Sequence, residues 1–323
     1  MKDYQFQNRN LSEGAQAAFA FRKPKDIVVI ALLSAVYLVL SYFLLGFKVD
    51  QLILVILVSS LYFSSKITRN FILAFSVFLV YWIIFDYMKA FPNYNYRPVQ
   101  IESLYLAERK LFAVNDHGVL LTPNEFWLKH SSSPLDILTG IFYLAWVPFP
   151  LLFGFFLYLK NRKQFFYFSL TFVWVNILGW IIYYSYPAAP PWYIQQYGFN
   201  FIPGTPGNVA GLARFDAFFN VSLFHSIYSK SSNVFAAMPS LHCAYPMIAF
   251  YYGLKNKMGL YNLLFAIIMV GIWFSAVYTS HHFVLDVLAG MACAVVGITS
   301  FELVVARSAF VRRFVEAWTN ATT

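Results

Sequence analysis

The sequence predicts an all-α protein, a polytopic membrane helical bundle of about eight spans. Three observations favour this fold class. The chain of 323 residues contains 60% hydrophobic and only 11% charged residues, and its mean hydropathy is +0.60. Its apolar residues gather in runs long enough for a helix to cross a hydrocarbon core about 30 Å thick. The alternating segments of about ten residues that are typical of a membrane β-barrel are missing.

The apolar runs divide the chain in order. We expect spans at about 26–46, 50–65, 70–88, 135–159, 164–186, 240–254, 259–280 and 283–306. The first three are distinct, whereas 240–254 is short and is assigned from its context. The sequence shows no repeat and no second domain. We therefore predict one membrane domain over 1–323, made of a tail at 1–25, three spans within 26–88, a surface segment at 89–134, a helical core at 135–306 and a tail at 307–323.

The basic residues indicate the topology of the chain. The formal net charge is +9, and Lys and Arg gather in the polar N-terminal tail, in short turns and near the C-terminus: Lys2, Arg9, Arg22, Lys23, Lys25, Lys66, Arg69, Lys160, Arg162, Lys163, Lys255, Lys257, Arg307, Arg312 and Arg313. With eight spans, all of these segments fall on one side of the membrane. The positive-inside rule makes that side, and both termini, cytoplasmic. A nucleic-acid partner is not expected.

Two long segments between spans fall on the extracytoplasmic face, where we expect the active site. In 89–134, the apolar residues Leu104, Tyr105, Leu111 and Phe112 recur at helical spacing from Ile101 onward, opposite Glu102, Arg109 and Lys110. This pattern predicts an amphipathic helix on the membrane surface, although a solvated cap without substrate contact remains an alternative.

The second outer segment, 187–239, opens with "YPAAPPWY" at 186–193. We expect its prolines to prevent helix and to impose a rigid turn. We also expect Tyr186, Trp192 and Tyr193 to contact substrate.

Two adjacent histidines precede an aspartate in "TSHHFVLDVLAG", residues 279–290. On a helix, His282 and Asp286 share a face, so the carboxylate can accept a hydrogen bond from one ring nitrogen of His282. That bond fixes the tautomer and leaves the other nitrogen free as a nucleophile. His281 is five residues from Asp286 and faces elsewhere, so we give it a supporting role in substrate binding.

A third histidine stands in "AAMPSLHCAYP", residues 236–246. Pro239 sets a helix start, Ser240 lies near its first turn, and His242 is presented at the outer membrane surface. A helix N-terminus suits an anion such as phosphate, and a histidine beside that anion can act as a general acid. We expect Ser240 to bind substrate, and the two histidine sites together favour phosphoryl transfer through a phosphohistidine.

Simpler alternatives exist for each of these residues. A histidine in an apolar helix is often a packed core residue, and Asp136 is expected to be a helix-end residue without partners. His, Asp and Cys side chains could also bind a metal ion, but no compact pair such as C-x-x-C or H-E-x-x-H is present. We therefore expect no metal and no cofactor.

These residues resemble two motifs of the type 2 phosphatidic acid phosphatase superfamily. "PSLH" at 239–242 is similar to P-S-G-H, and "SAVYTSHHFVLD" from Ser275 to Asp286 is similar to S-R-x5-H-x3-D. The resemblance covers about 135–306 and implies a six-helix core. Leu241 replaces the glycine, Ala276 replaces the arginine, and the usual first motif, K-x6-R-P, is not found.

The departures resemble the branch that contains fungal inositol phosphorylceramide synthases, which has P-S-L-H, a doubled histidine and a turn like A-P-P-W-Y. This resemblance implies that His282 is the nucleophile, Asp286 its orienting partner and His242 the acid and then the base. It also implies inositol phosphate as the transferred group.

The missing cations favour the same function. A phosphate monoester carries nearly two negative charges, which a site without the lysine and two arginines of the phosphatases would neutralise poorly. A phosphodiester lipid carries one. We therefore expect a phospholipid head-group phosphotransferase, with a phosphatidylinositol-like donor and a ceramide-like or diacylglycerol-like acceptor. A lipid phosphate phosphatase of the same fold and a non-catalytic membrane transporter remain alternatives.

Overall fold

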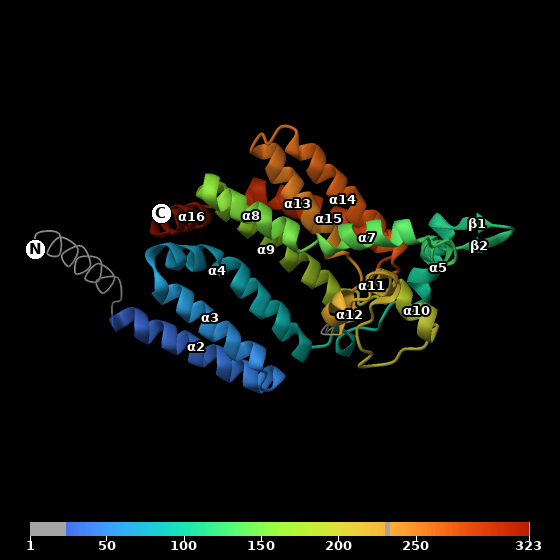
Figure 1. Cartoon of the computed structure of the whole chain (residues 1–323), viewed down its shortest axis with the longest axis horizontal. Helices are drawn as coiled ribbons and strands as arrows, with labels where there is room; N and C mark the ends of the chain where they lie inside the picture. The colour runs from blue at the N-terminus through green and yellow to red at the C-terminus, as the bar shows by residue number, and fades with distance from the viewer. Residues whose placement is uncertain (1–23, 230–232, 323) are drawn as a thin grey trace, which may run out of the picture. The chain divides into compact units, whose positions relative to one another are not determined.

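The computed structural model describes residues 24–229 and 233–322, so most of the tail expected at 1–25 lies outside the described residues. The described chain is helical apart from loops and one short antiparallel hairpin, which confirms the all-α fold class (Figure 1). It forms two compact units, Met1–Ala90 with Ala317–Thr323, and Phe91–Glu316. The single membrane domain over 1–323 stays a prediction.

The first unit contains α2 (Pro24–Leu45), α3 (Val49–Ser64), α4 (Lys66–Tyr87) and a 3-10 turn at Met88–Ala90. Most side chains of these helices are apolar and exposed, as expected of helices that face lipid. A few polar contacts join them. The Ser41 and Tyr87 hydroxyls lie 2.9 Å apart, and the Arg69 guanidinium lies 3.1 Å from the Asp26 carboxylate.

Five described helices are long and apolar enough to cross a membrane. They are α2, α4 with the turn that follows it, α9 (Arg162–Ser185), α14 (Tyr261–Tyr278), and α15 (Val284–Ser300) with the π-helical turn Phe301–Val305. The helices expected at 50–65 and 240–254 are present as α3 and α13 (Leu241–Lys255), but they have only 16 and 15 residues. The protein is therefore a multi-pass membrane protein, while the total of eight spans stays a prediction.

The span expected at 135–159 is not one straight helix. It consists of α7 (Ser133–Leu144) and α8 (Pro148–Lys160), and the chain bends by 41° between them. Pro148 has no N–H group and fits a helix only in its first turn, so a new helix starts there. The rings of Tyr143 and Trp146, at this bend, lie against His242.

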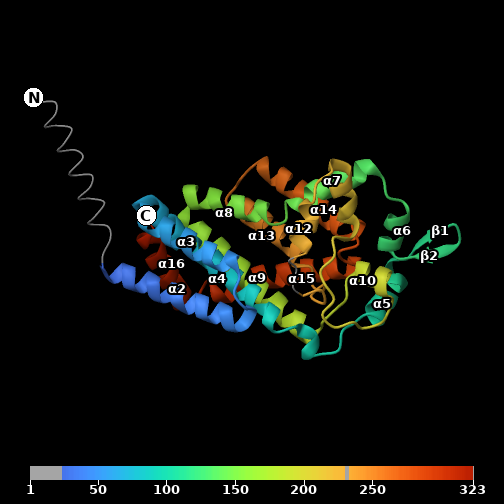
Figure 2. The same ribbon diagram turned by 60° about the horizontal axis from the view of Figure 1, so that its bottom comes forward.

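Six helices form the core of the second unit: α7, α8, α9, α13, α14 and α15. Among them, α13 packs against α8, α9, α14 and α15, which makes it the central helix (Figures 1 and 2). The start of α13 and the start of α15 carry the histidine motifs. Both starts lie at the same end of the unit.

The outer segments gather at that end. They comprise 3-10 turns at Asn93–Asn95 and Ala210–Leu212, α5 (Glu102–Phe112), the hairpin of β1 (Val114–Asp116) and β2 (Val119–Leu121), α6 (Pro123–Lys129), α10 (Pro191–Tyr197), α11 (Ala213–Phe219) and α12 (Leu223–Tyr228). After the core come the π turn and α16 (Ala309–Ala321). The Gln100 N–H donates to the Pro187 carbonyl (2.7 Å), and the Ala188 N–H donates to the Phe235 carbonyl (2.8 Å). The first bond joins the two outer segments, and the second joins the two ends of the second outer segment.

The rigid turn expected at 186–193 is only half correct. The chain is extended through Pro190, but α10 begins at Pro191, so Trp192 and Tyr193 are helical. The expectation overlooked that proline is well suited to the first position of a helix, where its missing N–H costs nothing.

The amphipathic helix expected from Ile101 is present as α5, but its buried face differs from the expected one. Leu104 and Glu108 are buried, whereas Leu111, expected on the apolar face, is largely exposed. Because α5 packs against α15, its buried face meets protein. The position of α5 at the membrane surface stays a prediction.

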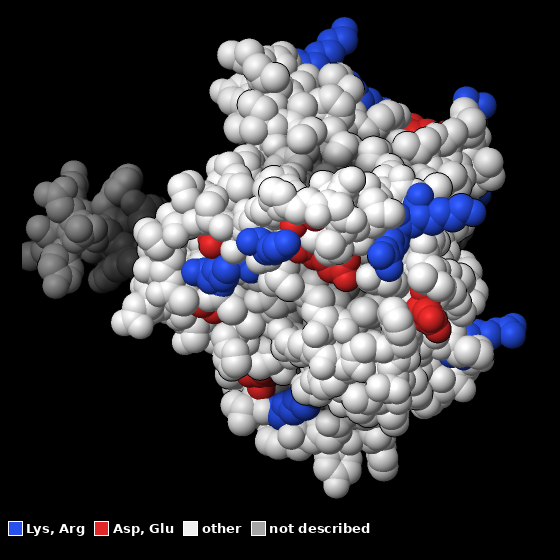
Figure 3. Space-filling model, turned by 90° about the vertical axis from the view of Figure 1, so that its right-hand side faces the viewer, with Lys and Arg blue, Asp and Glu red and all other residues white. Residues whose placement is uncertain are grey.

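Charged side chains are scattered over the end of the unit where α5 and the hairpin lie (Figure 3). Acidic and basic groups lie close to one another there, as where Lys129 Nζ lies 2.5 Å from Asp116. Basic and acidic groups are interspersed over this face of the described residues.

Candidate active site

The turn between α14 and α15 presents His282. The helix α14 ends at Tyr278, and Ser280 adopts a left-handed conformation with φ +59°, which reverses the chain. The N–H groups of His281 and His282 then both donate to the carbonyl of Ala276, at 3.1 and 3.0 Å. Ala276 thus contributes its backbone to the position of His282, although its side chain lacks the cation that the superfamily motif has there.

Asp286 lies beside His282, but the expected hydrogen bond between them is not made. The distance from His282 Nδ1 to Asp286 Oδ2 is 3.6 Å, which is longer than a hydrogen bond. The carboxylate oxygen instead accepts the N–H of Phe283 at 2.8 Å. The expectation assumed that both residues are helical, whereas His282 precedes the first residue of α15, Val284.

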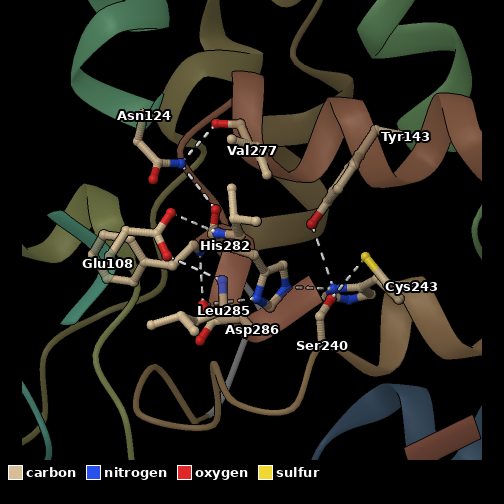
Figure 4. Close-up of polar contacts among 12 residues, drawn as sticks. Glu108, Asn124, Tyr143, Ser240, Cys243, Val277, His282, Leu285 and Asp286 are labelled. Atoms are coloured by element: carbon tan, nitrogen blue, oxygen red, sulfur yellow. Dashed lines mark hydrogen bonds and ion pairs between the residues drawn. The ribbon is translucent and has the colours of Figure 1, made fainter. Parts of the chain in front are cut away.

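His242 and His282 are in direct contact (Figure 4). His242 Nδ1 lies 3.0 Å from His282 Nε2, although 39 residues separate the two histidines in the chain. A hydrogen on His242 Nδ1 makes it the donor and keeps the lone pair of His282 Nε2 as the acceptor. The hydrogen of His282 then resides on Nδ1, which faces Asp286. This is the tautomer that a nucleophilic Nε2 requires.

The starts of α13 and α15 are joined through their backbones. The Ser240 N–H donates to the carbonyl of Asp286 at 2.9 Å. Gly290, one turn further along α15, allows this approach, because a Cβ at position 290 would lie 2.2 Å from the Ser240 carbonyl oxygen. Leu241 fills the space above Gly179 of α9, where a Cβ would lie 2.7 Å from Leu241 Cδ2. Two glycines therefore bring His242 to His282.

The side chains around the histidines are mainly aromatic. The Tyr143 hydroxyl lies 3.4 Å from His242 Nδ1, and the Trp146 ring centre lies 4.2 Å from that of His242. His281 stacks between Tyr143 and Tyr228, and its Nε2 lies 3.2 Å from the Val209 carbonyl oxygen. This packing fixes the ring of His281, and its supporting role in substrate binding stays a prediction.

The other residues expected to bind substrate differ in accessibility. Ser240 is buried, and its hydroxyl donates to Cys243 Sγ at 3.2 Å. Trp192 and Tyr193 are buried too, whereas Tyr186 is 37% exposed. The Trp192 N–H donates to the carbonyl of Ser280 at 3.0 Å, which ties α10 to the turn between α14 and α15. Tyr186 is therefore the most accessible of the four. Direct contact with substrate stays a prediction for all of them.

Asp136 lies in the first turn of α7, as expected of a helix-end residue, but the expectation that it lacks partners is wrong. Its Oδ1 lies 2.6 Å from Arg214 Nε and accepts the Tyr278 hydroxyl at 2.8 Å. The Arg214 guanidinium also lies over the Tyr278 ring, 5.3 Å from its centre. Arg214, the cation that α11 brings towards the turn between α14 and α15, is therefore already paired with a carboxylate.

The sequence reasoning missed two further buried residues, Glu108 and Asn124. The Glu108 carboxylate accepts the N–H groups of Val284 and Leu285, and the Asn124 side-chain amide donates to the carbonyl of His282 (Figure 4). Glu108 follows Leu104 by four residues, so helical periodicity already placed it on the apolar face of α5. Burial raises the pKa of Glu108 to about 7.

Burial keeps His282 neutral. It lowers the pKa of His282 to about 4, an effect that the nearby Ala237 carbonyl only partly offsets. Burial also lowers the pKa of His281, and His282 adds to this effect. Among residues 24–229 and 233–322, no group of three or more His, Cys, Asp or Glu residues is arranged to hold a metal ion.

The lowered pKa gives a first testable prediction. We expect His282 to remain unprotonated down to about pH 5, whereas an ordinary histidine titrates near pH 6.5. Because the unfolded chain binds this proton more tightly, folding should weaken as the pH falls below about 6.5. The measurement is the NMR titration of 15N-labelled histidines, with His282 assigned by comparison with His282→Asn. A His282 resonance that titrates near pH 6.5 would contradict the prediction.

The helical bundle brings His242, His282 and the buried carboxylate of Asp286 together at one end. The protein is therefore a multi-pass membrane protein with a histidine site. Comparison with known proteins gives the family. Residues 104–300 match the PAP2 superfamily, so the chain belongs to that superfamily. No solved structure matches the chain.

Several synthases are similar to the chain. It is 44% identical over 280 residues to the phosphoinositol dihydroceramide synthase of Bacteroides thetaiotaomicron, an alignment that covers 86% of this chain and 92% of that protein. It is 29% identical over 234 residues to the inositol phosphorylceramide synthase catalytic subunit of Schizosaccharomyces pombe, and 30% identical over 222 residues to that of Saccharomyces cerevisiae. These alignments cover 68% and 62% of this chain, and 51% and 49% of the fungal proteins.

Proposed function

We propose that the protein is a lipid phosphotransferase that moves inositol phosphate from a phosphatidylinositol-like donor to the hydroxyl of a ceramide-like acceptor. The contact of 3.0 Å between His242 and His282 is the observation that carries the proposal, because it brings a nucleophile and a proton donor to one place. The names of the relatives, above all the bacterial synthase at 44% identity, support this choice of donor and acceptor.

The proposed reaction has two steps, both of which use the histidine pair. In the first, His282 Nε2 attacks the donor phosphorus, the bond from phosphorus to the diacylglycerol oxygen breaks, and His242, protonated on both ring nitrogens, gives that oxygen a proton and becomes neutral. In the second, His242 takes the proton of the acceptor hydroxyl, whose oxygen attacks the phosphorus. The bond from phosphorus to His282 then breaks, and both histidines regain their initial protonation.

The chemistry requires the two rings to separate. His282 Nε2 must approach the phosphorus to within about 3–3.5 Å, and the proton donor stands beyond the leaving oxygen on the opposite side. The present separation of 3.0 Å between the two nitrogens leaves no room for a phosphoryl group. We infer that the His242 ring turns away when the donor binds, while His282 is held by the turn between α14 and α15.

A phosphodiester donor fits the charges of the site. No hydrogen bond of the described residues uses the N–H of Leu241 or His242, the first two positions of α13, so both can donate to a phosphoryl oxygen. Arg214 is already paired with Asp136. Two N–H groups and a helix dipole suit a monoanion better than the dianion of a lipid phosphate, which is why we favour transfer over phosphatase activity.

We also propose that the site faces the extracytoplasmic side and that both termini are cytoplasmic. Within the second unit, Arg162 begins α9 and Lys255 ends α13, whereas His242 lies in the first turn of α13. A helix of 15 residues is about 22 Å long, so the basic turn after α13 lies far from the histidines. The positive-inside rule then places the basic end in the cytoplasm.

A single assay tests the proposed function and constitutes our second prediction. The purified protein is given a ceramide or a diacylglycerol together with head-group-labelled phospholipids, one at a time, with and without EDTA. We expect label to pass from phosphatidylinositol to ceramide, and EDTA to leave the rate unchanged.

The other outcomes of this assay are equally informative. Release of water-soluble labelled phosphate or inositol phosphate in place of labelled ceramide would indicate a phosphatase. Absence of reaction with every donor would favour the non-catalytic transporter. Transfer that EDTA abolishes would contradict the metal-independent mechanism.

A further inference from the structure

The first outer segment reaches the catalytic turn through Glu108 of α5. One oxygen of its carboxylate accepts the N–H of Val284 at 2.9 Å, and the other accepts the N–H of Leu285 at 3.0 Å. The side chain of Asp286 accepts the preceding N–H, that of Phe283. Two carboxylates thus take up three consecutive N–H groups at the start of α15, which would otherwise lack partners within the helix.

Asn124 of α6 holds the same turn from the other direction. Its Nδ2 donates to the carbonyl of His282 at 2.9 Å and to the carbonyl of Val277, at the end of α14, at 2.8 Å. The first turn of α6, which carries Asn124, is fixed by a capping box, because the Thr122 hydroxyl accepts the N–H of Glu125 and the Glu125 carboxylate accepts the N–H of Thr122. Asn124 therefore ties the end of α14 to the backbone of the nucleophile.

We propose that Glu108 and Asn124 are positioning residues, which fix the backbone on both sides of the His282 ring so that Nε2 stays directed at the donor phosphorus. The inference rests on the proposed function, because it assigns both residues to the rate of head-group transfer. Both side chains are fully buried, and neither is among the residues that touch the reacting atoms in the proposed reaction.

The arrangement of charges explains why a carboxylate is needed at position 108. The residue accepts two N–H groups at once, which a carboxylate can do with its two oxygens, whereas an amide offers one oxygen and places an NH2 group against the second donor. A glutamine would therefore leave one buried N–H unpaired and push the first turn of α15 aside. His282, immediately before that turn, would move with it.

The outer segment acquires a specific function from this geometry. The sequence left open whether residues 89–134 form a surface helix or a solvated cap. Its helices α5 and α6 contribute two buried side chains to the turn that carries the nucleophile, 176 and 158 residues away along the chain. A displacement of about 1 Å at a reacting atom can lower a rate about 100-fold, so a clamp of this kind has a large effect on turnover.

The test, our third prediction, compares Glu108→Gln and Asn124→Ala with matched control variants. Glu102→Gln changes an exposed glutamate of the same helix, and Asn115→Ala changes an exposed asparagine of the hairpin. We expect kcat for transfer to fall about 10- to 100-fold in the two test variants, with the KM for phosphatidylinositol within about threefold of its original value. Both controls should stay within about twofold of the original kcat.

Two further measurements separate positioning from simple stabilisation of the fold. The first is the rate at which His282 becomes labelled by a donor carrying a labelled head-group phosphate, which should fall in parallel with kcat. The second is the folded fraction of each variant from thermal unfolding in detergent, measured against the assay temperature. Glu108→Asp, which keeps both oxygens on a shorter side chain, should recover part of the rate that Glu108→Gln loses.

The proposal is overturned if Glu108→Gln and Asn124→Ala keep kcat within about twofold of the original value. It is also overturned if their activity falls only in proportion to the folded fraction, because both residues would then merely stabilise the fold. If the unaltered protein transfers no head group from any donor, the proposed function fails, and the positioning role fails with it. An active original protein with unaffected variants rejects the positioning role alone.

Discussion

Replacing His282 with asparagine is expected to abolish head-group transfer. The amide nitrogen of asparagine can take the place of Nδ1 beside Asp286, but no atom replaces Nε2, the nitrogen that would attack phosphorus. Loss of a nucleophile from a covalent mechanism costs roughly 10⁴-fold or more in kcat. The measurement is transfer of labelled head group to ceramide, together with covalent labelling of the protein, which should disappear.

Two other histidines make this experiment specific. His225 of α12 is exposed, so His225→Asn should leave transfer unchanged. His281→Phe keeps an aromatic ring between Tyr143 and Tyr228, and its loss of activity should be far smaller than that of His282→Asn. If His282→Asn retains activity near the original level while His281→Phe does not, the two adjacent histidines have been assigned the wrong way round.

The sequence was sufficient to predict which residues meet at the site. Helical spans and their alternation placed His242 and His282 at one end of the bundle, because each stands at the outer start of an apolar run. The structure brings their ring nitrogens to 3.0 Å, with Asp286 adjacent. Long apolar runs give reliable helices, since a chain in lipid must satisfy its backbone hydrogen bonds internally.

The local sequence pattern could not predict which contacts position His282 and Asp286. The spacing of His282 and Asp286 indicates a shared helix face only if both are helical, and the left-handed Ser280 ends that regularity. The bend before Pro148 and the start of α10 at Pro191 depend on where proline falls relative to a helix start. The roles of such residues depend on neighbours that are distant in the sequence.

The outer segment illustrates the same limit. Periodicity puts Glu108 on the apolar face of α5, but nothing nearby in the sequence reveals its partners, Val284 and Leu285. A buried carboxylate is tolerated only where donors satisfy it, so its position on that face was itself a signal of a specific contact. The sequence shows a glutamate on the apolar face of a helix, and only the fold shows which N–H groups it accepts.

Replacing Gly290 with alanine is expected to have the second large effect. The new Cβ would lie 2.2 Å from the Ser240 carbonyl oxygen and 3.0 Å from its carbon, and both are backbone atoms that no rotation of a side chain can move away. The start of α13 must therefore shift away from α15, which stretches the hydrogen bond from the Ser240 N–H to the Asp286 carbonyl. His242 moves with that helix start, away from His282.

We expect Gly290→Ala to lower kcat for transfer about 100-fold and to destabilise the fold by about 1–3 kcal/mol, as for other overpacked cores. Gly179→Ala is the matched control, because the atoms closest to its new Cβ belong to the Leu241 side chain, which can rotate. It should lose markedly less of both. Equal losses in the two variants, measured by transfer rate and thermal unfolding in detergent, would contradict the view that the backbone contact between Gly290 and Ser240 sets the separation of the two histidines.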